Sequence, residues 1–216
     1  MMNTALQYKK YFRNPQFLFS ALLSVILLFV SLVINFFAIA SATDKASNSV
    51  TDIILNNIPV YDVQLAFIYG PLIMWIFVFC LLFLRPNQIP FTLNSISLFV
   101  LIRSVFINMT HLGPFPTEIP ISPESFINYF ASGGDLFFSA HTGLPVLLAF
   151  IFWKSDALKF FFIVCSIFFG AVVLMGHLHY TIDVLSAFFI TYTIFRLSEI
   201  FFKKDKQMFD QESMVL

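Results

Sequence analysis

The chain alternates long apolar runs with short polar stretches. Six runs reach roughly the 20 residues that a helix needs to cross a bilayer. Because every backbone group must be satisfied inside a membrane, such runs are read as helices. We therefore predict an all-α, polytopic membrane protein with six transmembrane helices in a single domain over residues 1–216. The predicted spans cover about 17–40, 65–84, 89–112, 137–153, 158–176 and 180–202.

The first apolar run and two of the polar stretches have further features. The first run follows basic residues and contains "AIASA" at 38–42, which resembles a signal-peptide cleavage site. It is longer than the 7–15 residues typical of a signal peptide's apolar core, so we predict a retained span, with cleavage as the alternative. The charged stretch 203–216 is predicted to be a disordered cytoplasmic tail. The proline-rich loop 113–136 is predicted to be irregular.

Basic residues indicate how the helices are oriented. They lie before the first run, between the second and third, between the fourth and fifth, and after the sixth, whereas the other polar stretches contain only Lys45. The positive-inside rule then predicts two cytoplasmic termini and an exoplasmic face formed by 41–64, 113–136 and 177–179. That face is periplasmic in a bacterium and lumenal or extracellular in a eukaryote. All four histidines fall there: His111, His141, His177 and His179.

Composition narrows the functional classes. The chain is 59% hydrophobic and 11% charged, with 31 phenylalanines. A soluble domain has about 25% charged residues. The formal net charge of zero gives no field that would attract nucleic acid. Cys80 and Cys165 lie in apolar runs, where a thiol behaves as a small hydrophobic group, so neither a disulfide nor a metal site is predicted.

The stretch "HYTID" places an imidazole and a carboxylate four residues apart. On a helix, His179 and Asp183 would lie on one face. The carboxylate could hold one ring nitrogen protonated and leave the other as a nucleophile. A hydrogen bond that only tethers two helices is the alternative. Ionisable groups inside membranes are usually functional, which favours the first interpretation.

Two more stretches offer partners for this pair. In "GDLFFSAHTG", His141 lies at the start of the fourth run and could protonate a leaving group. The alternative is an interfacial histidine at a helix start, where Ser139 or Thr142 is only the cap. Asp135 is close enough to influence the imidazole. In "LIRSVFINMTHLGPFP", Arg103 lies about 13 Å from the end of its helix. It is either a clamp for phosphate or the structural partner of Asp183 or Asp135.

Two histidines, a carboxylate and an arginine suit phosphoryl transfer through a phosphohistidine without a metal or other cofactor. The motifs resemble the type 2 phosphatidic acid phosphatase (PAP2) superfamily, to which "FSAHT" and "GHLHYTIDV" are similar. They are still more similar to its sphingomyelin synthases, over about residues 90–200. The resemblance implies a PAP2-like bundle with His179 as nucleophile, Asp183 as its partner and His141 as general acid. Tyr180 and His177 are predicted to surround them.

Three functions remain open from the sequence. The first is a sphingomyelin synthase-like transferase, which moves a phospho-head group from a phospholipid to ceramide or diacylglycerol. The second is a lipid phosphate phosphatase, in which water replaces the lipid alcohol. The third is a catalytically silent lipid-binding protein. Membrane lipids are the predicted partners in all three, and the departure at Val173, where the phosphatases carry an arginine, favours the transferase.

Overall fold

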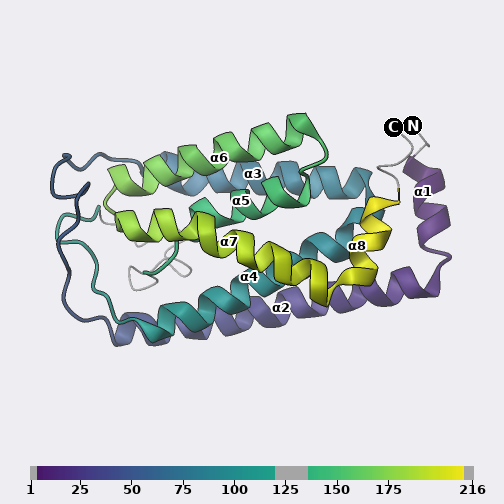
Figure 1. Ribbon diagram of the computed structural model, residues 1–216, viewed down its shortest axis with the longest axis horizontal. Coiled ribbons are helices and arrows are strands. Elements are labelled where there is room, and N and C mark those ends of the chain that lie inside the picture. Colours follow the sequence, from purple (N-terminus) through teal and green to yellow (C-terminus); the bar gives the residue numbers. More distant parts are fainter. Residues whose placement is uncertain (1–3, 120–135, 212–216) are drawn as a thin grey trace.

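Helices make up most of the described chain. The computed structural model describes residues 4–119 and 136–211. Two loops, 45–63 and 110–119, gather at one end of the bundle, which we call the loop end (Figure 1). The elements are α1 (Thr4–Tyr11), α2 (Pro15–Asp44), α3 (Gln64–Leu84), η1 (Pro86–Gln88), α4 (Ile89–Met109), α5 (Ala140–Ile151), α6 (Asp156–Met175), α7 (Thr181–Phe201) and α8 (Lys203–Asp210).

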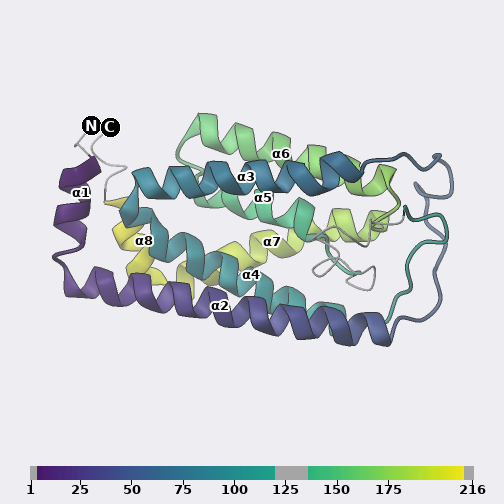
Figure 2. The same ribbon diagram turned by 180° about the vertical axis from the view of Figure 1, so that it is seen from behind.

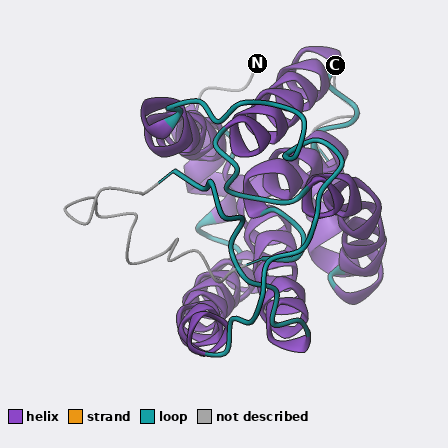
Figure 3. Cartoon of the chain, turned by 90° about the vertical axis from the view of Figure 1, so that its left-hand side faces the viewer, coloured by secondary structure: helices purple, strands orange, loops and turns teal. Residues whose placement is uncertain are grey.

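The helices form an elongated bundle with α5 in the middle. Helix α2 packs along α4, and α5 packs against α4, α6 and α7. Helix α3 lies beside α6, while α1 and α8 lie at the end opposite the loops, which we call the terminal end (Figures 1 and 2). Viewed along the bundle, the loops cross the ends of the helices (Figure 3). Large apolar side chains such as Phe19, Phe79 and Ile167 are exposed on the outside, as expected of a surface that faces lipid.

Five described helical segments are long and apolar enough to cross a bilayer, which indicates an integral membrane protein. These segments are α2, α3, η1 with α4, α6 and α7. The sixth predicted span, 137–153, is shorter: α5 has 12 residues. Phe137 and Phe138 have positive φ values of 96° and 23°, a conformation that interrupts a right-handed helix. The prediction of six spans is therefore not confirmed.

The predicted disordered tail is wrong over residues 203–210, because α8 is a helix packed on the bundle. The Asp205 carboxylate accepts a hydrogen bond from Asn94 Nδ2 at 2.8 Å. Phe209 is buried, with its ring edge-on to Phe91 at 5.7 Å. Asn87 Nδ2 contacts the carbonyl of Phe209. Although the segment is rich in charged residues, one face of α8, formed by Asp205 and Phe209, packs against α4 and η1.

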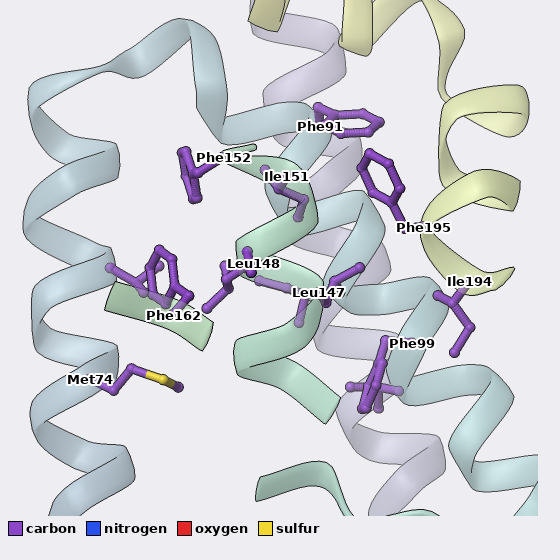
Figure 4. Packing of buried hydrophobic residues seen from close by; sticks show 14 of the residues in the cluster. Met74, Phe91, Phe99, Leu147, Leu148, Ile151, Phe152, Phe162, Ile194 and Phe195 are labelled. Carbon is purple, nitrogen blue, oxygen red and sulfur yellow. The ribbon is translucent and has the colours of Figure 1, made fainter. Parts of the chain in front are cut away.

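The main core surrounds α5. Leu147 and Leu148 of α5 are fully buried among Phe99 of α4, Phe162 of α6 and Ile194 of α7 (Figure 4). Because lipid tails are as apolar as these side chains, their burial stabilises the fold through close van der Waals packing rather than through removal from water. This packing fixes the position of α5 along α7, and with it the segment just before α5.

One glycine allows the close approach of α5 to its neighbours. A Cβ atom on Gly143 would lie 2.7 Å from Phe99 Cζ and 3.0 Å from Thr191 Oγ1. Such contacts are shorter than van der Waals distance, so only glycine fits here without a shift of the buried Phe99 ring or the Thr191 side chain. Gly143 is two residues from His141, and the tight crossing therefore helps to position that histidine.

Candidate active site

His179 and Asp183 form a buried pair at the start of α7. His179 Nδ1 lies 3.1 Å from Asp183 Oδ2, and the two residues are 4% and 0% exposed. When Nδ1 donates its proton to this carboxylate, Nε2 of the same ring is left with the lone pair. The sequence predicted this pairing, and it places a nitrogen suitable for nucleophilic attack beside α7.

The spacing had predicted that the two residues lie on one helix face, and this is not what the structure shows. Helix α7 begins at Thr181, so His179 belongs to the turn before it. Asp183 reaches back over the helix start, where its Oδ2 also accepts a hydrogen bond from the Tyr180 backbone N–H at 3.1 Å. The first N–H groups of a helix lack partners inside the helix, which makes this a favourable place for a carboxylate.

The start of α5 is joined to the start of α7. The Ser139 backbone N–H donates to the Asp183 carbonyl oxygen at 3.1 Å. His141, two residues further on, stacks on Phe67 of α3 with ring centroids 4.2 Å apart, and the edge of Phe169 also meets its ring. The structure therefore places His141 on a helix start hydrogen-bonded to the Asp183 backbone, with its imidazole held between aromatic rings.

Arg103 is buried and reaches the same region from α4. Its Nε donates to the Phe138 carbonyl oxygen at 3.2 Å, one residue before Ser139. Within the described residues, the hydrogen bonds to the Asp183 carboxylate come from His179 and Tyr180. The predicted alternative of an Arg103–Asp183 pair therefore does not occur there. The other predicted partner, Asp135, lies outside the described residues.

Three buried oxygen atoms near the two helix starts have no hydrogen-bond partner in the described part of the chain. They are Ser139 Oγ, Thr142 Oγ1 and Asp183 Oδ1. Ser139 occupies the position before α5, but its side chain makes no capping hydrogen bond, contrary to the simple cap that the sequence allowed. Buried polar atoms are nearly always partnered in native proteins, so these three oxygens are exceptions gathered at the two helix starts.

His177 anchors the loop end and does not reach the Asp183 carboxylate. It is buried with a φ of 54°, and its Nδ1 lies 2.5 Å from Thr117 Oγ1. Its ring packs edge-on against Phe115. Burial lowers the pKa of His177, although the Ile58 backbone and the Asp52 charge oppose that shift. These contacts fasten the loop 110–119 to the turn before α7.

Tyr180 fastens the same turn to both loops. Its hydroxyl donates to the Gly113 carbonyl at 2.9 Å and accepts from the Val50 N–H at 3.2 Å. The side chain is fully buried, while its backbone N–H is held by Asp183. Tyr180 thus joins the turn that carries His179 to both loops and to Asp183.

Asp52 is a residue that sequence reasoning missed. Its carboxylate accepts hydrogen bonds from the Thr181 N–H at 2.7 Å and the Thr181 hydroxyl at 2.6 Å, and from the N–H groups of Ile54 and Leu55. Burial alone would raise the pKa of Asp52, but these hydrogen bonds lower it overall. No local motif links residues 129 positions apart. A negative charge at the N-terminus of α7 also suits the helix dipole.

No group of three His, Cys, Asp or Glu side chains suited to a metal ion occurs within 4–119 and 136–211.

His141, His179 and Asp183 all lie in the segment that resembles a known family. Residues 132–200 match the family model described as "PAP2 superfamily C-terminal", and Arg103 lies outside this match. No curated protein matches the chain. The family match supports the PAP2 superfamily and, with it, an enzyme of the phosphatase or phosphotransferase kind acting on lipid phosphates.

Proposed function

We propose that the protein is a lipid phosphotransferase of the sphingomyelin synthase-like kind. It moves a phospho-head group from a phospholipid to ceramide or diacylglycerol through a phosphohistidine on His179. The observation that carries this proposal is the buried pair of His179 and Asp183 beside the start of α5, inside the segment that matches the PAP2 superfamily. Ionisable groups are costly to keep at such a position, and those that are found there usually have a function.

The first step forms the phosphohistidine. His179 Nε2 attacks the phosphorus of the donor lipid, and the bond between phosphorus and the diacylglycerol oxygen breaks. His141 gives a proton to that leaving oxygen. Asp183 keeps the proton on Nδ1 of His179 and stabilises the positive charge that develops on the ring, since Nδ1 and Oδ2 are 3.1 Å apart.

The second step reverses the proton movements. The hydroxyl oxygen of the lipid alcohol attacks phosphorus, its proton passes to His141, and the bond between phosphorus and Nε2 breaks. The head group is carried intact, and both histidines return to their starting states. The anionic oxygens of the head group are stabilised by the positive end of α5 and by Arg103, whose guanidinium binds the segment just before that helix.

Burial of the nucleophile favours a lipid alcohol over water as acceptor. His179 is 4% exposed, and Thr117, Phe115 and Tyr180 hold the two loops over the turn that carries it. Exclusion of water suppresses hydrolysis of a reactive intermediate. The site would lie at the exoplasmic face with both termini in the cytoplasm, because most of the basic residues lie at the terminal end.

The experiment uses purified protein in mixed micelles with fluorescent ceramide, fluorescent diacylglycerol, and unlabelled phosphatidylcholine or phosphatidylethanolamine. A parallel reaction contains phosphatidic acid and measures free phosphate. His179→Ala is the blank, and His111→Ala, an exposed histidine at the same end of the bundle, is the matched control. We expect a new fluorescent phospholipid in the wild type and the control, and none in the blank.

The other outcomes separate the remaining functions. Free phosphate without a fluorescent product would identify the phosphatase of the second interpretation. Lipid binding without either product would identify the silent lipid-binding protein. Turnover by His179→Ala would refute the phosphohistidine mechanism.

A further inference from the structure

A cavity lies at the terminal end of the bundle, away from His179. It has a volume of about 340 Å³ and is bounded by the end of α5, the last turns of α7 and Lys206 of α8. Arg196 in its wall lies roughly 22 Å along α7 from Thr181, at 1.5 Å per residue. The volume is sufficient for a small ligand or a lipid head group. The proposed phosphotransfer uses none of the residues that line this cavity.

One wall of the cavity is aromatic. Phe150 stacks on Trp153 and on Phe195, with centroid distances of 5.7 and 5.6 Å, and meets Tyr192 edge-on at 5.5 Å. Trp153 and Tyr192 are 51% and 53% exposed, so the wall continues to the molecular surface. Exposed tryptophan and tyrosine at the ends of membrane helices are typical of the level at which lipid head groups lie.

The rest of the lining carries cations in excess over carboxylates. Lys154, Arg196 and Lys206 line the cavity, with Glu199 2.6 Å from Arg196. Asp210 lies 3.0 Å from Lys154 and 3.4 Å from Lys206. Three positive charges therefore face two negative ones. The Lys154 and Arg196 side chains are 61% exposed, and an ammonium or guanidinium has more N–H donors than one carboxylate uses.

We propose that this cavity binds the phosphate group of an anionic ligand. The phosphate oxygens would accept charge-assisted hydrogen bonds from Arg196 and Lys154, in the bidentate geometry to which a guanidinium is suited. The aromatic wall of Trp153 and Tyr192 would contact the adjacent apolar part of the ligand. A phospholipid head group supplies both parts at this depth, and free phosphate supplies the first alone.

Trp153 provides the reporter for a test. The chain has two tryptophans, so Trp75→Phe leaves Trp153 as the only one. Detergent-solubilised full-length protein is titrated with phosphatidylglycerol, with phosphatidylcholine of the same acyl chains, and with sodium phosphate. The double variant Lys154→Ala/Arg196→Ala is compared with Lys203→Ala/Lys204→Ala, which removes two exposed charges of α8 from the same end. Lys154→Arg/Arg196→Lys keeps both charges and controls for loss of folding.

The expected result is a saturable change in Trp153 fluorescence with phosphatidylglycerol. Lys154→Ala/Arg196→Ala should lower the affinity for phosphatidylglycerol about tenfold or more, since each charge-assisted hydrogen bond contributes on that scale. The Lys203/Lys204 variant should bind as the parent does, and the charge-preserving variant should retain most of the affinity. The same pattern with sodium phosphate would identify the free anion as a sufficient ligand. No saturable change, an equal response to phosphatidylcholine, or equal losses in both alanine double variants would overturn the proposal.

Discussion

Replacing Asp183 by Asn tests the central feature of the site with little change of shape. Asp183 Oδ2 accepts two hydrogen bonds, from His179 Nδ1 and from the Tyr180 N–H. An asparagine oxygen in the same place accepts both but carries no charge to stabilise an imidazolium. If the amide turns around, its NH₂ faces Nδ1 and forces the ring proton onto Nε2, which removes the nucleophilic lone pair.

The two consequences differ greatly in size. The fold loses an anion at a helix start, worth about 0.3–1 kcal/mol, and the strength of a charged acceptor, about 1 kcal/mol more. The reaction loses the orientation and stabilisation of its nucleophile, which in histidine sites of this kind costs about 10³- to 10⁴-fold in rate. That ratio corresponds to about 4–5.5 kcal/mol in the activation barrier.

The assay measures both quantities on the same preparations. Initial rates of head-group transfer are compared for wild type, Asp183→Asn and His179→Ala, and thermal unfolding is followed by circular dichroism in detergent. We expect a small shift in melting temperature with a loss of rate of at least about 10³-fold. If Asp183→Asn kept more than about a tenth of the wild-type rate while His179→Ala was inactive, the orienting role of the carboxylate would be wrong.

Three further predictions concern stability. Asp52→Asn should lower the free energy of unfolding by about 1–3 kcal/mol at neutral pH, because the Thr181 N–H and hydroxyl lose a charged acceptor. The pKa of Asp52 is lowered in the fold, so this stabilisation is present above the ordinary value of 3.8 and should disappear as the pH falls below it. Acid denaturation curves of wild type and variant should therefore converge. Burial lowers the pKa of His177, so the wild type should lose stability as the pH falls below the ordinary value of 6.5. His177→Asn tolerates the positive φ, and its melting temperature should depend less on pH between about pH 6.5 and 5. An equal dependence in wild type and variant would contradict the burial argument. Gly143→Ala should destabilise by about 1–3 kcal/mol through its contact with Phe99. A melting temperature equal to that of wild type would show that the Phe99 ring moves aside without cost.

The sequence indicated the membrane helices well because their signal is simple. The bounds of α3 and α7 lie within one residue of the predicted runs. Hydropathy could not show that 137–153 contains only a short helix, since Phe137 and Phe138 are as apolar as a helix interior but adopt positive φ values. It also could not show that α8 forms, because the partners of Asp205 and Phe209 come from distant segments.

The candidate site was predictable where its residues are close in sequence and not where they are distant. The spacing of His179 and Asp183 was sufficient to predict their contact, although a turn rather than a helix brings them together. The role of Asp52 could not be predicted, since a carboxylate in a loop looks the same whether it meets solvent or the start of a helix that follows 129 residues later.

The hydrogen bonds that hold the start of α7 also determine when the site can form during synthesis. They join Asp52 to Thr181, Ser139 to Asp183 and, through Phe138, Arg103 to the same place. Contacts so distant along the chain close late, after local helices have formed. A nascent chain that has inserted α2 to α6 already contains His141 but lacks the Asp183 carboxylate. The His179–Asp183 pair therefore forms only after α7 has been made, and under the proposed mechanism an incomplete chain that ends before α7 would be unable to attack the surrounding lipids.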